Sequence, residues 1–429
     1  MNAFEKDIFA AADTELLRFT TAGSVDDGKS TLIGRLLVDS KGVFEDQLDA
    51  ARNIEEKKGA KGAYLALLTD GLQAEREQGI TIDVAYRYFA TPKRKFIIAD
   101  TPGHEQYTRN MVTGASTAHL AIILIDARKG VLVQSRRHAY ISRLLGIPHI
   151  VVAINKMDLV DYSQEVYEKI KQEFAEFYGK LAMSGGEVTF IPISALEGDM
   201  VVERGSNMPW YQGETLLEKL ESTPVTGKVT AKDFRFPVQY VSRPQTEELH
   251  DFRGYMGRIE SGLIKVGDAI TVLPSGLTSR IKEIVSFDGN LQQAFVPMSV
   301  TLTLEDERDI SRGDMIVHTE SQPQVLKEFD AMACWMSETP LQAGKKYLIK
   351  HTTSTVKAMV TALQDRVDIN TLDRIATPPE LKMNEIGRVS FKLLKPIACD
   401  PYQENRATGA FIIIDDFSNQ TVGAGMISQ

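Results

Sequence analysis

The stretch Gly23-Ser-Val-Asp-Asp-Gly-Lys-Ser30 fits the pattern G-x-x-x-x-G-K-[ST]. Residues 16–22 before it read as a β-strand, and residues 30–37 after it carry apolar side chains at helical spacing. A glycine-rich turn in this place points successive backbone N–H groups inward, and the following helix adds its positive N-terminal end. We therefore expect a phosphate-binding loop in an α/β domain. On this string alone, a chance glycine loop is the alternative.

Two side chains of this loop have a predicted role in charge and metal binding. Lys29 can reach the β- and γ-phosphate oxygens as a mobile point charge, and the hydroxyl of Ser30 is placed to ligate the Mg²⁺ that bridges them. The loop residues that we expect to contact the nucleotide are Gly23, Ser24, Val25, Asp26, Asp27, Gly28, Lys29, Ser30 and Thr31.

A second string, Asp100-Thr-Pro-Gly-His104, follows the apolar run 95–99. It places the carboxylate of Asp100 at the C-terminal end of a strand, the edge at which open α/β sheets bind ligands. We expect Asp100 to hold the magnesium through water. Gly103 leaves room for its backbone N–H to approach a γ-phosphate, a contact by which such a loop senses GTP against GDP. A plain β-turn is the alternative.

Two further strings concern the nucleotide base. Asn155-Lys-Met-Asp158 follows the apolar run 150–154, and Ser194-Ala-Leu196 follows another strand-like run, 188–193. The carboxylate of Asp158 can accept two hydrogen bonds, from N1–H and the 2-amino group of guanine, which adenine does not offer. The second string would lend a backbone N–H to the guanine O6. The residues expected around the base are Asn155, Lys156, Asp158, Ser194, Ala195 and Leu196.

The order of these strings resembles the translation-factor class of GTPases, and the stretch Glu75-Arg-Glu-Gln-Gly-Ile-Thr-Ile82 narrows the match. The resemblance implies that Thr81 closes over the nucleotide and completes the magnesium and water sites. It also implies that Ile80 and Val25 form an apolar gate and that His104 orients the attacking water. An exposed loop histidine is the alternative for His104.

Further residues point to one branch of this class. Elongation factors usually carry histidine at the positions of Ser24 and Asp27. This chain differs from them at both positions. In that difference, and in segments along nearly the whole chain, it resembles the family of GTPase subunits of bacterial sulfate adenylyltransferase, also called ATP sulfurylase. The segments are residues 70–79, 83–88, 126–130, 251–257 and 421–426. The resemblance also suggests a monovalent cation near Asp26, for which the capping of a turn is the alternative.

This resemblance implies a GTPase that uses Mg²⁺, with catalytic residues Lys29, Thr81 and His104 and metal ligands Ser30, Thr81 and Asp100. It implies a smaller catalytic partner subunit, which makes adenylylsulfate and pyrophosphate from ATP and sulfate while GTP hydrolysis drives the reaction. The ATP and sulfate sites are then expected on the partner. The alternatives are an elongation-factor-like GTPase that delivers a tRNA and a scaffold that turns over GTP only incidentally.

No arginine can be chosen from the sequence as an additional catalytic charge. The candidates read equally well as surface or helix charges; they are Arg35, Arg76, Arg109 and Arg128.

Composition agrees with an ordinary globular protein that can bury large cores. Of the 429 residues, 43% are hydrophobic and 25% are charged. The net charge of −9 argues against a general nucleic-acid binder, which would carry a basic surface. Cys334 and Cys399 lie far apart without metal-ligand spacing, and we expect reduced thiols and a cytoplasmic location. The N-terminal segment 4–17 is too charged for a secretory signal, and no apolar stretch is long enough to span a membrane.

The sequence predicts a P-loop GTPase domain of the α/β class with a mainly parallel sheet, followed by two antiparallel β-barrel domains. Strand-like and helix-like segments alternate over residues 1–224, as in βα units, while residues 225–324 and 325–429 are rich in short β segments with glycine turns. The polar insertion 40–70 belongs by position to the first switch region. Whether an adenylylsulfate kinase domain follows, as in some relatives, stays open.

Overall fold

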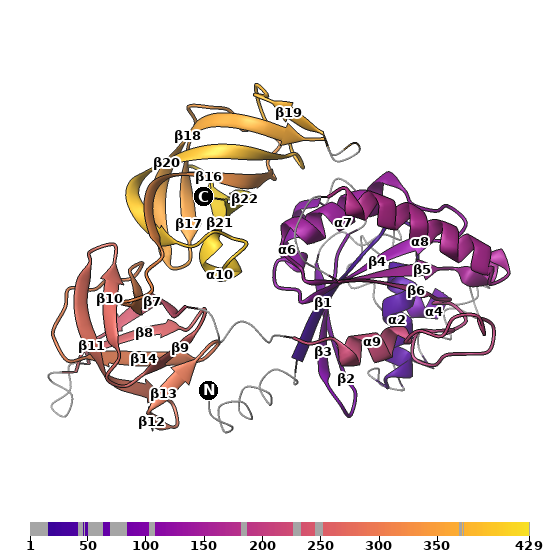
Figure 1. Cartoon of the computed structure of the whole chain (residues 1–429), viewed down its shortest axis with the longest axis horizontal. Coiled ribbons are helices and arrows are strands. Elements are labelled where there is room, and N and C mark those ends of the chain that lie inside the picture. The colour runs from indigo at the N-terminus through magenta and orange to yellow at the C-terminus, as the bar shows by residue number, and fades with distance from the viewer. Residues whose placement is uncertain are drawn as a thin grey trace. The chain divides into compact units, whose positions relative to one another are not determined.

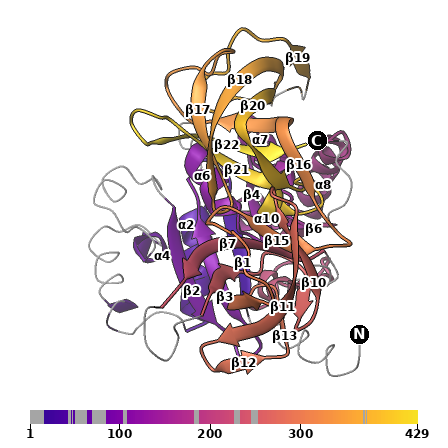
Figure 2. The same cartoon turned by 90° about the vertical axis from the view of Figure 1, so that its left-hand side faces the viewer.

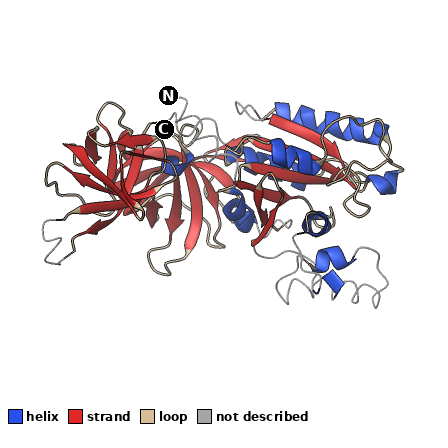
Figure 3. Cartoon of the chain, turned by 90° about the horizontal axis from the view of Figure 1, so that it is seen from below, coloured by secondary structure: helices blue, strands red, loops and turns tan. Residues whose placement is uncertain are grey.

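The computed structural model describes residues 16–41, 46, 48–49, 63–68, 84–102, 108–181, 187–225, 233–244, 252–368, 371 and 373–428. The chain divides into two compact units. The first consists of Met1–Val225 with Ile369–Leu372, and the second of Thr226–Asp368 with Asp373–Gln429. Helices gather in the first unit, and strands make up almost all of the second (Figure 3). The three domain ranges expected from the sequence stay predictions.

The first unit is built on a six-stranded sheet in the order β2-β3-β1-β4-β5-β6, with helices on both of its faces (Figure 1). Neighbouring strands are parallel except for the edge strand β2, which is antiparallel to β3. The strands are β1 (Leu16–Ala22), β2 (Ala85–Ala90), β3 (Lys95–Asp100), β4 (Leu120–Asp126), β5 (His149–Asn155) and β6 (Glu187–Pro192). All seven residues of β4 are buried, because helices cover both faces of a parallel sheet.

The helices of this unit within the described residues connect these strands. They are α2 (Lys29–Asp39), α4 (Ala63–Leu67), α6 (Thr108–Ala115), α7 (Val133–Leu144), α8 (Gln164–Gly179), α9 (Leu216–Ser222) and the 3₁₀ turn η2 (Met157–Val160). A Cβ on Gly34 of α2 would lie 2.2 Å from the carbonyl oxygen of Leu65 in α4, so glycine allows the two helices to touch. None of the described helices is long and apolar enough to cross a membrane.

The parallel register brings the C-terminal ends of the strands to one edge of the sheet. Thr21 pairs with Asp100 across β1 and β3, and Asp126 pairs with Asn155 across β4 and β5. Ligands of open α/β sheets bind at this edge. The strings singled out in the sequence therefore follow the strands at the same side of the unit.

The second unit contains two antiparallel barrels. The first follows the order β10-β15-β7-β8-β14-β11-β12 and closes through β10–β11, with β9 and β13 paired beside it. Its strands are β7 (Arg235–Ser242), β8 (Gly254–Arg258), β9 (Leu263–Lys265), β10 (Ala269–Leu273), β11 (Leu277–Ser286), β12 (Gly289–Leu291), β13 (Gln293–Phe295), β14 (Ser299–Leu304) and β15 (Met315–His318).

The second barrel follows the order β17-β21-β22-β16-β20-β18-β19 and closes through β17–β18. The long strands β18 and β20 curve around it (Figure 2). Its elements are β16 (Gln324–Trp335), β17 (Lys346–His351), β18 (Ser354–Val367), β19 (Arg374–Ala376), β20 (Ile386–Cys399), α10 (Arg406–Gly409), β21 (Ala410–Ile414) and β22 (Thr421–Ile427). The predicted fold class, an α/β domain followed by two antiparallel barrels, is confirmed.

Each barrel has its own apolar core, and a small third cluster joins them. Phe236 and Tyr255 lie in the core of the first barrel, and Trp335 and Phe391 lie in that of the second. The third cluster combines residues of both barrels: Leu273, Met315, Val317 and Ala398. The barrels therefore share buried surface within the second unit.

Candidate guanine-nucleotide site

The phosphate-binding string forms the turn between β1 and α2, as the sequence predicts. Gly28 takes the left-handed conformation (φ 94°) where α2 begins. A Cβ at this position would lie 2.5 Å from Nδ2 of Asn155, so both the backbone angle and the neighbour require glycine. The absence of a side chain at Gly28 therefore lets the loop pack directly against the side chain of Asn155.

Asp27 closes this loop onto itself. Its carboxylate is 1% exposed, and Oδ2 accepts a 2.6 Å hydrogen bond from the backbone N–H of Ser24. Burial raises the pKa of Asp27, and the bond from Ser24 opposes that rise. Within the described residues, neither Oδ1 of Asp27 nor the hydroxyl of Ser24 has a hydrogen-bond partner. Two polar groups of the loop thus keep capacity for a bound group.

The ammonium group of Lys29 lies over the same loop. Its Nζ donates to the carbonyl oxygens of Gly23 (2.9 Å) and Ser24 (3.1 Å). Burial lowers the pKa of Lys29, while the nearby carboxylates, Asp100 first among them, favour its charged form. The structure therefore brings the predicted phosphate-binding lysine together with the predicted metal-binding carboxylate.

Asp100 ends β3 beside the loop and is 2% exposed. The hydroxyl of Thr21 donates to its Oδ1 at 3.4 Å, and the hydroxyl of Thr101 donates to the carbonyl oxygen of Thr21 at 2.6 Å. Ser30 lies in the first turn of α2 and is half-buried. A hydroxyl and a carboxylate at the C-terminal edge of the sheet are oxygen ligands of the kind that Mg²⁺ takes.

Asn155 connects the phosphate loop to the third and fourth strings. Its Nδ2 donates to the carbonyl oxygen of Asp27 at 2.8 Å, and its Oδ1 accepts from the backbone N–H of Ala195 at 3.0 Å. The side chain is 2% exposed. One buried amide therefore uses its donor and its acceptor to hold two separate loops in register.

Asp158 is oriented by the fourth string. The hydroxyl of Ser194 donates to Oδ1 of Asp158 at 2.6 Å and accepts from the backbone N–H of Glu197 at 3.2 Å. Both side chains are part-buried. The predicted base-recognising carboxylate is thus held by the residue that begins the Ser194–Leu196 string.

Arg35 of α2 donates hydrogen bonds to the backbone of the same string. Sequence reasoning missed this contact. Its Nε donates to the carbonyl oxygen of Ala195 at 3.2 Å, and its Nη2 donates to that of Leu196. Nη1 also lies 3.6 Å from Asp39, one turn further along α2. The sequence reads Arg35 as a surface or helix charge, and only its place inside α2, seven residues after Gly28, hints at this contact.

Asp126 forms a second buried charge centre beside the loop. Its carboxylate, 1% exposed, receives two hydrogen bonds from the guanidinium of Arg128 (3.0 and 2.7 Å) and lies 3.0 Å from Nζ of Lys156. Lys156 also donates to the carbonyl oxygen of Asp26. Burial would raise the pKa of Asp126, but these bonds hold it well below its usual range. The signal in the sequence was a carboxylate directly after the apolar run of β4.

Several predicted residues lie outside the described part of the chain: Ile80, Thr81, Gly103 and His104. Their roles stay predictions. Val25 and Thr31 lie in the loop and in α2 and are half-buried, and Asp26 is exposed with φ 69°.

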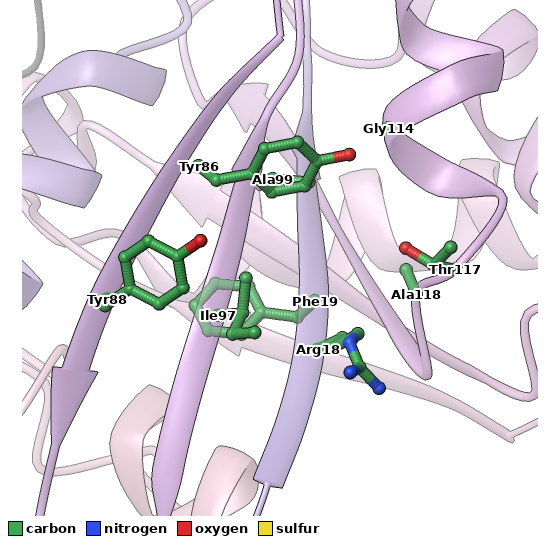
Figure 4. Close-up of a pocket in the computed structure, with 9 residues that line it drawn as sticks. All are labelled: Arg18, Phe19, Tyr86, Tyr88, Ile97, Ala99, Gly114, Thr117 and Ala118. Atoms are coloured by element: carbon green, nitrogen blue, oxygen red, sulfur yellow. The ribbon is translucent and has the colours of Figure 1, made fainter. Parts of the chain in front are cut away.

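A separate pocket with a volume of about 250 Å³ lies on one face of the sheet, between β2 and the segment that follows α6 (Figure 4). Figure 4 shows Tyr86 and Tyr88 of β2 on one side and Thr117 and Ala118 on the other. Its one charged lining residue is Arg18. It contains none of the predicted nucleotide-binding residues, so it is a different surface from the candidate site.

Two protein-family models match the chain. The elongation factor Tu GTP binding domain matches residues 14–226, and the GTP-eEF1A C-terminal domain-like family matches residues 328–428. Among solved structures, sup35 complexed with GDP covers 97% of this chain at 23% identity, with a TM-score of 0.44.

Curated relatives match over almost the full chain. Sulfate adenylyltransferase subunit 1 of Saccharophagus degradans is 59% identical over 96% of this chain and 87% of its own length. The protein of the same name from Alteromonas mediterranea is 56% identical over the same shares. The bifunctional enzyme CysN/CysC of Mycobacterium tuberculosis is 55% identical over 96% of this chain and 67% of its own length. The chain belongs to the sulfate adenylyltransferase subunit 1 family, within the translation-factor class of GTPases.

Proposed function

We propose that this chain binds GTP with Mg²⁺ and hydrolyses it, and that hydrolysis drives adenylylsulfate formation from ATP and sulfate on a smaller catalytic partner subunit. The observation that carries the nucleotide part is the bridge made by Asn155 between the phosphate loop and the Ser194–Leu196 string. Its bonds of 2.8 and 3.0 Å hold the two loops at one edge of the sheet. A guanine nucleotide can bind with its phosphates at the first of these loops and its base at the second.

Magnesium binding is proposed for Ser30, Thr81 and Asp100. Mg²⁺ usually takes one or two protein oxygens, together with water and substrate phosphates, so it needs no dedicated protein cage. The described residues contain no cluster of three or more His, Cys, Asp or Glu side chains that could hold a metal. The buried carboxylate of Asp100 near Nζ of Lys29 fits the sparse kind of site.

Hydrolysis is assigned to positioning and charge rather than to covalent chemistry. Lys29 and the metal would balance the phosphate charge, Thr81 would close over the nucleotide, and His104 would orient the attacking water. Guanine selection is assigned to Asp158, which Ser194 orients at 2.6 Å. Besides the side chains of Lys29 and Ser30, backbone N–H groups of the loop residues 23–31 would contact the phosphates.

The proposed partner is the smaller catalytic subunit, which would carry the ATP and sulfate sites. The relatives' name, subunit 1, supports a partner, and their identity over 96% of the chain favours this function over tRNA delivery. We propose that the switch segments around Ile80 and His104 change their contacts with the partner as the nucleotide changes, because coupling needs an element with two arrangements. We further propose a cytoplasmic location, without nucleic-acid or membrane partners.

The test is adenylylsulfate formation by this chain mixed with a cognate small subunit, in the presence of GTP, GDP or a non-hydrolysable GTP analogue. GTP is expected to raise product beyond the equilibrium reached with ATP and sulfate alone, and GDP and the analogue are not. Product that stays at that equilibrium with GTP, while GTP is still hydrolysed, would leave a GTPase without coupling. Retention of aminoacyl-tRNA by the GTP-bound chain would instead favour the elongation-factor alternative.

A further inference from the structure

A pocket of about 500 Å³ with both polar and apolar lining residues lies between the two barrels of the second unit. One wall is the loop before β15, residues 311–314, and the other is the tight hairpin between β17 and β18 with residues 395–398 of β20. The volume is in the range of pockets that bind small molecules. Because the predicted nucleotide-binding residues belong to the first unit, this pocket is not part of the candidate GTP site.

The hairpin wall contains four successive residues with hydroxyl groups, Thr352, Thr353, Ser354 and Thr355. His351 and Ser354 pair across the strands, so Thr352 and Thr353 form a two-residue turn. Thr352 has φ 48°, a left-handed conformation that is strained for a β-branched residue and normally selects glycine. The hydroxyl of Thr353 is buried without a hydrogen-bond partner among the described residues. Strain and an unsatisfied hydroxyl together mark the hairpin as more than a connection.

Two cationic side chains, Arg312 and Lys395, line the pocket. The guanidinium of Arg312 donates a 2.8 Å hydrogen bond from Nη1 to the carbonyl oxygen of Gln239, and within the described residues its other N–H groups are available for a ligand. Lys395 is exposed and, among the described residues, has no salt bridge. The single carboxylate, Asp314, is turned into its own loop, where Oδ2 accepts the backbone N–H of Ser311 at 2.8 Å.

Several buried residues complete the lining, among them His351, whose Nε2 contacts the carbonyl oxygen of Thr408 at 2.7 Å. The apolar residues Met315, Val356, Ile397 and Ala398 are between 2% and 7% exposed. Hydroxyls and two cations on the rim, above an apolar base, match a molecule with an oxyanion group and an apolar part.

We propose that this pocket binds a small organic anion, whose phosphate or sulfate group contacts Arg312, Lys395 and the hydroxyls of the β17–β18 hairpin while its apolar part lies against Met315 and Ile397. The site goes beyond the proposed GTPase function and does not depend on it. Binding would also clamp the two barrels, because the cations come from different barrels.

The test is calorimetric titration of the full chain with phenyl phosphate, phenyl sulfate and phenol, probes that carry no nucleobase. One of the two anions is expected to bind, with phenol at least tenfold weaker, and the better anion identifies phosphate or sulfate as the recognised group. The double variant Arg312→Gln/Lys395→Met should weaken binding at least tenfold, the size expected from loss of charge-assisted hydrogen bonds.

Lys392→Met is the matched control. This lysine lies on the same strand, β20, but pairs with Glu328 at 2.6 Å and is not among the lining residues. It should leave binding unchanged. No binding of either anion to the wild-type chain, or equal weakening by the control and the double variant, would overturn the proposal.

Thr352→Gly separates strain from function. Glycine accepts φ 48° readily, so the variant should raise the thermal midpoint of the second unit by about 2 °C while weakening anion binding through loss of one hydroxyl. A variant that is stabilised and binds the anion as well as wild type would contradict the role assigned to the hairpin.

Discussion

Asp158 and Asn155 illustrate, at the residue scale, how single side chains carry the proposed specificity. Asn155 uses both ends of one amide to join two loops, and Asp158 is oriented by one hydroxyl. The sequence predicted both as base-site residues from their place after a strand. It did not predict the bond from Asn155 to Asp27, because the partners lie 128 positions apart.

Asp158→Asn is expected to weaken GTP binding and to improve binding of xanthosine triphosphate. Xanthine replaces the 2-amino donor of guanine by a carbonyl acceptor, which the amide N–H of asparagine can meet. Loss of one charge-assisted hydrogen bond predicts a drop in GTP affinity of about tenfold or more. Competition of labelled GDP with GTP and with xanthosine triphosphate measures both effects. A variant that keeps wild-type preference for GTP would show that Asp158 is misassigned.

His138 of α7 predicts a pH dependence of stability. The side chain is 4% exposed, and burial, reinforced by the charges of Lys29 and Arg137, lowers its pKa from 6.5 to about 3. Below pH 6.5 the unfolded chain therefore binds a proton that the folded chain does not. The contribution of His138 to stability is intact above pH 6.5 and is lost as the pH falls toward 3.

At pH 5 this loss amounts to about 2 kcal/mol in the free energy of unfolding of the first unit. Urea unfolding at pH 7 and pH 5 measures it, with His138→Gln as the comparison. The variant should show a smaller decrease between the two pH values than wild type. Equal decreases in the two proteins would assign the acid sensitivity to other groups.

At the scale of elements, helix α2 does more than present the phosphate loop. Its first turn carries Lys29 and Ser30, its glycine at position 34 lets α4 approach, and Arg35 holds the carbonyl oxygens of Ala195 and Leu196. One rigid element therefore relates the phosphate end and the base end of the candidate site.

Arg35→Gln should weaken GDP and GTP binding by about tenfold, because the Ser194–Leu196 string loses a charged donor that makes two bonds to it. Arg35→Lys should recover part of the affinity, since it restores the charge without the two-pronged geometry. Asp39→Asn is the control: it breaks only the 3.6 Å contact with Arg35 and should change affinity little. Fluorescence titration with a labelled GDP distinguishes the three variants, and unchanged affinity in Arg35→Gln would remove the proposed role.

At the scale of the whole molecule, the two barrels are joined by a buried ion pair. Nε and Nη2 of Arg235 in β7 each donate to Asp400 at 2.9 Å, and the hydroxyl of Thr408 donates to the same carboxylate. The two charged residues are 3% and 7% exposed. Because each barrel supplies one charge, the pair ties the barrels into a single unit.

Asp400→Asn should reduce the free energy of unfolding of the second unit by about 3 kcal/mol, because the buried guanidinium loses its closest counter-charge and keeps only the more distant, exposed Asp233 at 3.7 Å. The exposed pair Lys357–Asp416 provides the control, and Lys357→Met should cost less than about 1 kcal/mol. Calorimetric unfolding of the two variants tests the difference. Similar small losses in both would show that the barrels do not depend on the buried pair.

The sequence by itself determined the fold class and the place of several strands, and it predicted which residues form the candidate site. The strands predicted over 16–22, 95–99 and 150–154 correspond to β1, β3 and β5 within one residue at each end. These features are local: an apolar run, a glycine turn and the residue after a strand are read within about ten positions.

Only the tertiary structure decided which of these residues support one another. Arg35 reaches the Ser194–Leu196 string across about 160 positions, and Arg235 reaches Asp400 across 165. The pocket between the barrels likewise combines the loop before β15 with the hairpin after β17. Charged side chains at such separations look like ordinary surface residues in a sequence, because burial and the choice of partner arise only when the elements pack.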